Sequence, residues 1–133
     1  MKYKVVLANG CFDIWHYGHL RHLQAARAMG DVLIVSVTDD AHVNKGPGRP
    51  IFRDWQRAEV VEQQKCVLRA IVVPSLLEAL KLVQPDILCK GIDYAAGLNP
   101  EHTEYCKTHG IEIRFTDTPK ISVIGLINES QRR

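Results

Sequence analysis

Two histidines three positions apart, His16 and His19, are the residues of this sequence best placed to do chemistry. They stand at the predicted start of a helix, where three residues make almost one turn, so both imidazoles can face the same way. Gly18 lies between them, and its missing side chain lets a ligand approach the backbone. A helix N-terminus also offers free N–H groups and partial positive charge. These residue types at this spacing predict a phosphate-binding site.

Two other interpretations of the histidine pair stay open at the level of sequence. The histidines can be surface residues without a function, which is the commoner case in proteins generally. They can also bind a metal ion, because His22 continues the same spacing by three more residues. We predict phosphate binding and assign no metal ligand.

The elements that must position these histidines follow from aliphatic runs that alternate with helical segments. Strands are predicted over residues 4–8, 32–37, 67–73, 87–90 and 111–115, and helices over 18–29, 54–64, 75–83, 100–108 and 122–130. Continuous aliphatic strands are typical of strands buried on both faces, and the alternation favours a parallel sheet with helices on both sides. We therefore predict an α/β fold, a Rossmann-like, doubly wound sheet of five parallel strands in one domain, with Asp54 and Ser75 as helix N-caps.

Ligands of such a sheet bind beyond the carboxyl ends of its strands. The loops to inspect are residues 9–17, 38–52, 91–99 and 116–122, which are rich in polar, basic or glycine residues. The chain has no Gly-x-x-x-x-Gly-Lys-Ser/Thr motif, so it is not a P-loop protein. It also lacks Gly-x-Gly-x-x-Gly after the first strand, which argues against the usual dinucleotide site.

Composition excludes several other classes of protein. Of 133 residues, 46% are hydrophobic and 24% charged, which is typical of an ordinary globular domain and excludes disorder as the main state. The net charge of +2 is too small for a dedicated nucleic-acid binder. No apolar run approaches a membrane span, and the sequence has no Cys-x-x-Cys pair. We expect no secretory signal, because the apolar stretch near Met1 is short. We expect a cytoplasmic protein with reduced cysteines that binds neither nucleic acid nor membrane.

The histidine pair belongs to a longer pattern, Gly10-Cys11-Phe12-Asp13 followed by His16-x-Gly18-His19, which resembles the signature of the cytidylyltransferase-like nucleotidyltransferases. That superfamily includes glycerol-3-phosphate cytidylyltransferases and the adenylyltransferases of ADP-heptose synthesis. Four further segments resemble motifs of the family: Lys45-Gly46-Pro47-Gly48-Arg49-Pro50, Gln56-Arg57, residues 85–94 with Lys90-Gly91-x-Asp93-Tyr94, and Ile121-Ser122. The resemblance therefore spans nearly the whole chain.

The resemblance implies an enzyme that couples a nucleoside triphosphate to a small phosphorylated acceptor, such as a sugar 1-phosphate, and releases pyrophosphate. It assigns catalysis to His16, His19 and Lys45. Nucleotide binding is assigned to Gly10, Cys11, Phe12, Asp13, Gly18, Lys90, Gly91, Asp93 and Ser122. Contacts with the acceptor or with phosphate are assigned to Arg49, Arg57 and Lys120. The resemblance further implies Mg²⁺ and a homodimer, and it favours ATP over CTP.

Several residues keep two interpretations. Asp13 can orient Mg²⁺ or cap the first helix, Arg57 can contact phosphate or lie on a helix surface, and Ser122 can cap the last helix or donate to phosphate. Cys11, near a helix N-terminus, is predicted to be sensitive to alkylation. Trp15, Phe52 and Trp55 are expected to shape a pocket rim or a subunit contact.

Two alternative functions also stay open. The first is a CTP-dependent glycerol-3-phosphate cytidylyltransferase. The second is a nucleotide-binding module without catalysis. Val123 and Ile124 replace two threonines of the family's last motif, and Asp117 stands where many cytidylyltransferases have arginine. These departures motivate the non-catalytic alternative.

Overall fold

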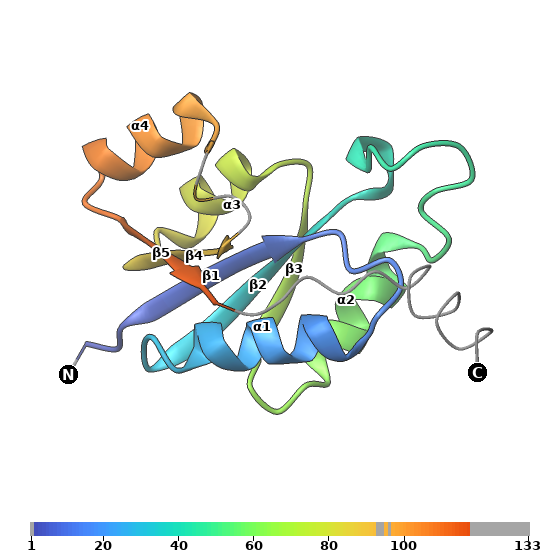
Figure 1. Ribbon diagram of the computed structural model, residues 1–133, viewed down its shortest axis with the longest axis horizontal. Coiled ribbons are helices and arrows are strands. Elements are labelled where there is room, and N and C mark those ends of the chain that lie inside the picture. The colour runs from blue at the N-terminus through green and yellow to red at the C-terminus, as the bar shows by residue number, and fades with distance from the viewer. Residues whose placement is uncertain (1, 93–94, 96, 118–133) are drawn as a thin grey trace.

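A five-stranded parallel sheet forms the centre of the computed structural model, which describes residues 2–92, 95 and 97–117. Its strands lie in the order β3-β2-β1-β4-β5 and span β1 Val5–Gly10, β2 Val32–Thr38, β3 Arg69–Val73, β4 Ile87–Gly91 and β5 Glu112–Thr116. Every neighbouring pair is parallel. The predicted Rossmann-like sheet is confirmed (Figure 1).

The helices cover both faces of this sheet (Figure 1). They span α1 Tyr17–Arg27, α2 Asp54–Glu62, α3 Leu76–Val83 and α4 Pro100–Thr108, with a short 3₁₀ turn η1 at Asp40–His42. Leu23 of α1 and Val61 of α2 pack in one core cluster with Val6 and Val35 of the sheet. Residues of α3 and α4, such as Leu80 and Cys106, pack with the opposite face in a second cluster. Strands buried on both faces explain the continuous aliphatic runs of the sequence.

The helix boundaries agree with the sequence to within a few residues, with one correction at a cap. Ser75 caps α3 as predicted, its hydroxyl accepting a hydrogen bond from the Glu78 backbone N–H. Asp54 is the first residue of α2 and not its N-cap, which is Arg53. The Asp54 carboxylate instead accepts a hydrogen bond from the backbone N–H of Asp40, in the loop after β2. The predicted helix over 122–130 lies outside the described residues.

The strand order reverses between β1 and β4. The helix after β1, α1, packs on one face of the sheet, and the helix after β4, α4, packs on the other. β1 ends at Gly10 and runs into the loop before α1, and β4 ends at Gly91. The register places Thr116, the last residue of β5, beside Gly91. Ligands of open α/β sheets bind at such a reversal. Within the described part of the chain, no helix is long and apolar enough to cross a membrane.

Candidate active site

The imidazoles of His16 and His19 cap the N-terminus of α1 reciprocally. His16 is the N-cap, and its Nδ1 accepts a hydrogen bond of 3.0 Å from the backbone N–H of Gly18. His19 occupies the third helical position, and its Nδ1 accepts a hydrogen bond of 3.3 Å from the backbone N–H of His16. The rings stack with their centroids 3.8 Å apart. The arrangement is a capping box with histidines where Ser or Thr and Glu or Gln are usual.

These hydrogen bonds determine which ring nitrogen of each histidine carries the proton. A nitrogen that accepts from a backbone N–H is unprotonated, so each neutral ring carries its proton on Nε2 and donates from there. Burial lowers the pKa of His19 to about 4, with the charges of His16, Lys45 and His22 adding to the effect. Burial and Lys45 also lower the pKa of His16. Near neutral pH the site therefore presents two Nε2–H donors beside a helix N-terminus.

The Phe12 ring packs against the His19 ring. The Phe12 backbone is left-handed, with φ of 53°, which is unusual for a non-glycine residue and turns the side chain back toward β1. The ring is buried and meets the His19 ring edge-on at 5.3 Å between centroids. A Cβ on Gly10 would lie 2.8 Å from this ring, so Gly10 must be glycine. Gly10 and Phe12, predicted to bind nucleotide, here support the histidine pair.

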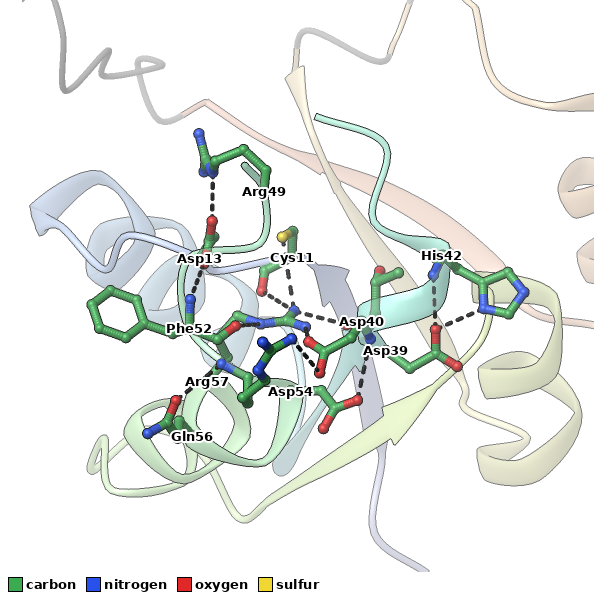
Figure 2. Close-up of polar contacts among 12 residues, drawn as sticks. Cys11, Asp13, Asp39, Asp40, His42, Arg49, Phe52, Asp54, Gln56 and Arg57 are labelled. Atoms are coloured by element: carbon green, nitrogen blue, oxygen red, sulfur yellow. Dashed lines mark hydrogen bonds and ion pairs between the residues drawn. The ribbon is translucent and has the colours of Figure 1, made fainter. Parts of the chain in front are cut away.

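Arg57 joins three segments around the loop that precedes His16 (Figure 2). Its Nη1 donates to the carbonyls of Cys11, at 2.9 Å, and Thr38, at 2.7 Å. Its Nε donates to the Phe52 carbonyl, and its Nη2 pairs with the Asp40 carboxylate at 2.8 Å. The residue is only 2% exposed.

This burial corrects the interpretation of Arg57 as a surface residue of a helix. The hydrogen bonds to protein groups use most of the guanidinium N–H donors, so Arg57 positions the Cys11 loop. A phosphate contact through Arg57 stays a prediction. The Cys11 thiol is half-buried with its Sγ 3.8 Å from Arg57 Nη1, and its sensitivity to alkylation also stays a prediction.

Asp13 ties the same loop to the chain just before α2. Its buried carboxylate accepts a hydrogen bond from the backbone N–H of Phe52 and pairs with Arg49 (Figure 2). It also accepts a hydrogen bond from the backbone N–H of Ile51. Burial alone would raise the pKa of Asp13, but these donors outweigh it and the pKa is lowered. The helix-cap role predicted for Asp13 is wrong, because His16 is the cap. Asp13 also does not fit as a Mg²⁺ ligand, since both oxygens already accept from protein donors.

Lys45 lies on the glycine-rich loop whose far end Asp13 and Arg49 anchor. Gly46 and Gly48 adopt φ of 97° and 77°, a region in which other residues are strained. The Lys45 charge acts on both His16 and His19. The structure thus brings Lys45 and the histidine pair, which the sequence assigned to catalysis, into one electrostatic neighbourhood.

The carboxyl end of β4 carries Lys90 and Gly91, two further residues that the resemblance assigns to nucleotide binding. Lys90 and Gly91 close this strand, next to β1 in the sheet. Asp93, Lys120 and Ser122 lie outside the described residues. Their predicted roles remain predictions.

The contact between His22 and Thr116 is one that the sequence does not predict. The sequence offers His22 only as a metal ligand, and among residues 2–92, 95 and 97–117 no group of three His, Cys, Asp or Glu side chains is placed to hold a metal. The His22 Nδ1 instead lies 2.7 Å from the Thr116 hydroxyl. Helical spacing predicts that His22 lies on the same face of the helix as His19. It cannot predict that His22 contacts a residue 94 positions away.

A mostly apolar pocket of about 340 Å³ opens beside the Asp13 clamp. Trp15 and Phe52 line it, together with Ile14, Gln56 and Val60 of the loop and α2. Trp15 and Phe52 thus line a pocket, and their expected role at the rim of the ligand site stays a prediction. Trp55 does not line this pocket, and it is 62% exposed.

Comparison with protein families identifies the chain. The model of a family described as cytidylyltransferase-like matches residues 7–124. The chain belongs to the cytidylyltransferase-like family. The resemblance inferred from the motifs is confirmed, and the chain is a nucleotidyltransferase by family.

Curated relatives of this cytidylyltransferase-like chain are named bifunctional protein HldE. The protein from Pseudomonas fluorescens is 40% identical over 130 residues, covering 95% of this chain and 26% of that protein. The protein from Helicobacter acinonychis is 46% identical over 100 residues, covering 70% of this chain and 21% of that protein. The chain thus spans about a quarter or less of the length of these relatives.

Solved structures give the same picture of the fold. A lipopolysaccharide core biosynthesis protein from Thermoplasma volcanium superposes with a TM-score of 0.73 at 27% identity, covering 91% of this chain and all of that one. A pantothenate synthetase from Thermus thermophilus superposes with a TM-score of 0.62 at 16% identity, covering 85% of this chain and 55% of that one. The second likeness concerns the fold alone.

Proposed function

We propose that this protein transfers a nucleoside monophosphate from ATP to a small phosphorylated acceptor of the sugar 1-phosphate class and releases pyrophosphate. The observation that carries the proposal is the reciprocal capping pair of His16 and His19. It presents two neutral Nε2–H donors at a helix N-terminus near Lys45. Such donors suit a triphosphate whose charge rearranges during reaction, because they need no reorganisation when the charge develops.

The proposed chemistry is an in-line displacement at the α-phosphorus. A phosphate oxygen of the acceptor attacks this atom, the new oxygen–phosphorus bond forms, and the bond to the bridging oxygen breaks. Pyrophosphate leaves with that electron pair. No protein nucleophile takes part, so the protein contributes orientation and charge stabilisation. His16 and His19 would donate to the triphosphate, and Lys45 would bind phosphate from its loop.

The choice of ATP and of a sugar phosphate rests on likeness. The motifs Gly10-Cys11-Phe12-Asp13 and Lys45-Gly46-x-x-Arg49-Pro50 resemble those of the adenylyltransferases of ADP-heptose synthesis. The relatives named HldE and the structural relative from lipopolysaccharide core biosynthesis support a sugar acceptor. CTP with glycerol 3-phosphate is the alternative pair, and a nucleotide-binding module without catalysis is the alternative from another class.

We also propose Mg²⁺, which polarises phosphate oxygens when it enters with the nucleotide. Because Asp13 is fully engaged by protein donors, no step is assigned to a metal held by that residue. The proposed compartment is the cytoplasm.

A homodimer is proposed from the apolar surface beside the pocket. Ile51, Phe52, Trp55 and Val60 are between 45% and 62% exposed, all on α2 or just before it. An exposed apolar patch of this kind marks an interaction surface. Light scattering of the wild type and of Trp55→Ser tests the dimer, and a monomeric wild type would refute it.

The proposed activity is tested by pyrophosphate release with Mg²⁺. ATP and CTP are crossed with sugar 1-phosphates and glycerol 3-phosphate, and His19→Ala serves as the matched negative control. Release that depends on both substrates supports the proposal. A nucleotide-dependent rise in melting temperature without release favours the non-catalytic module.

A further inference from the structure

A hydrogen bond between His22 and Thr116 joins the helix that carries the histidine pair to the outermost strand of the sheet. His22 Nδ1 and Thr116 Oγ1 lie 2.7 Å apart. Thr116 is 2% exposed and His22 is half-buried, so the bond is partly shielded from water. The proposed reaction gives neither residue a role.

The position of Thr116 relates this bond to the far side of the site. Thr116 pairs in register with Gly91, where β4 ends. β4 pairs with β1, and β1 leads through the Cys11 loop back to His16 and α1. The bond therefore closes a circuit of contacts from β1 through α1, β5 and β4. The histidine pair on α1 and the end of β4 both belong to this circuit, and Figure 1 shows the carboxyl end of β5 close to α1.

Helix geometry links His22 mechanically to the histidine pair. His22 follows His19 by three residues, which is a rise of about 4.5 Å along the axis at about 1.5 Å per residue. A single helical turn is rigid, so a shift of α1 at His22 also displaces His19. Misplacement of reacting groups by about 1 Å can slow a reaction by about 10²-fold.

We propose that His22 is a positioning residue, whose hydrogen bond to Thr116 sets the distance between the His16–His19 pair and the carboxyl end of β4. The proposal rests on the proposed function in that it places the nucleotide between these two groups. His22 does not touch the substrate and acts through α1.

The test compares two disrupting variants with two conservative ones. Thr116→Val removes the hydroxyl at constant shape, and His22→Phe keeps a ring without Nδ1. Thr116→Ser keeps the hydroxyl, and His22→Asn keeps a polar group close to the place of Nδ1. Thr108→Val, at the exposed end of α4, is the matched control for a threonine-to-valine change.

The expected result is a fall in kcat of about 10- to 100-fold in each disrupting variant, the size expected of misplaced reacting groups. kcat/KM should fall by at least as much, because the triphosphate between the displaced groups is also bound less tightly. The double variant His22→Phe, Thr116→Val should be no slower than His22→Phe alone, because His22→Phe already breaks the bond that Thr116→Val removes. Thr116→Ser and His22→Asn should recover most of the activity, and Thr108→Val should not change it.

A second readout separates this proposal from the proposed function. The NMR signals of the His19 ring and the dissociation constant of the nucleoside triphosphate are measured in the same variants. Thr116→Val should shift both relative to wild type and to Thr108→Val, whether or not turnover is detected. If wild type releases no pyrophosphate with any substrate pair, the proposed function fails and these two quantities decide on His22. The proposal would be overturned if Thr116→Val lowers stability but leaves the His19 signals and the triphosphate affinity at their wild-type values. Where turnover can be measured, its kcat would also have to stay at the wild-type value.

Discussion

The rings of His16 and His19 stack with their centroids 3.8 Å apart, and each ring accepts on Nδ1 a hydrogen bond from a backbone N–H at the start of α1. One arrangement thus caps the helix and leaves the Nε2–H of each neutral ring as its donor. Capping and chemistry use different nitrogens of the same ring, so suitable substitutions can separate them.

Replacing either histidine by alanine should reduce turnover by about 10²–10³-fold, the loss expected for one preorganised donor. Loss of the cap at His16 should also lower the free energy of unfolding by about 0.5–2 kcal/mol. His16→Asn keeps the side-chain acceptor of the cap without the Nε2–H, so it should restore stability and not turnover. Steady-state kinetics and urea unfolding measure the two effects. Full turnover in His16→Asn would show that the ring donor is unimportant.

The low pKa of His19 predicts a pH dependence of stability. Its pKa is about 4 in the folded protein and 6.5 for the free side chain, so between these values the unfolded chain binds more protons. The stabilisation is complete above about pH 6.5 and is lost as the pH falls toward 4, with a slope of at most about 1.4 kcal/mol per pH unit. His19→Gln keeps an acceptor for the cap and removes the titration.

The free energy of unfolding should therefore depend less on pH between 4.5 and 6.5 in His19→Gln than in wild type. Urea titrations of both proteins at several pH values measure the difference. Because both proteins keep every carboxylate, their difference isolates His19. Parallel curves would contradict the buried, neutral imidazole.

Arg57→Ala should lower the free energy of unfolding by about 2–4 kcal/mol, as expected for a broken buried hydrogen-bond network. The change removes the Arg57 N–H donors to the carbonyls of Cys11 and Thr38. Arg53→Ala is the matched control, because Arg53 has a 67% exposed side chain and meets Asp40 at 3.9 Å. Its cost should be about 0–1 kcal/mol. Equal costs in the two variants would refute the positioning role of Arg57.

Asp13→Asn should weaken the anchor of the Lys45 loop. An asparagine keeps one acceptor oxygen but presents an amide donor toward groups that themselves donate. We expect a loss of about 1–3 kcal/mol of stability and a higher KM for the nucleotide. Asp31→Asn, an exposed site with a hydrogen bond to the Lys4 backbone, controls for the change of charge. If Asp13→Asn has the same KM for the nucleotide as wild type, the loop that Asp13 anchors does not contribute to nucleotide binding.

The order of strands and helices could be predicted because aliphatic runs and helix ends are local patterns. The surroundings of Arg57 could not, because its acceptors come from three separate segments that only the folded chain brings together. Asp13 is similar: its partners lie at least 36 positions further along the chain. Motifs therefore predict where the candidate site lies. The structure was needed to show which of its groups, such as Arg57 and Asp13, hold the loops through hydrogen bonds to other parts of the protein.

The measurement that tests the central claim most directly is pyrophosphate release by wild type and His19→Gln, with Mg²⁺, ATP and a panel of sugar 1-phosphates. Wild type should release pyrophosphate only when nucleotide and acceptor are both present. His19→Gln, which keeps the cap and an N–H donor, should be folded and slower than wild type but faster than His19→Ala. Equal release by wild type and His19→Ala with any substrate pair would contradict the account, because the histidine pair would then play no part in the reaction.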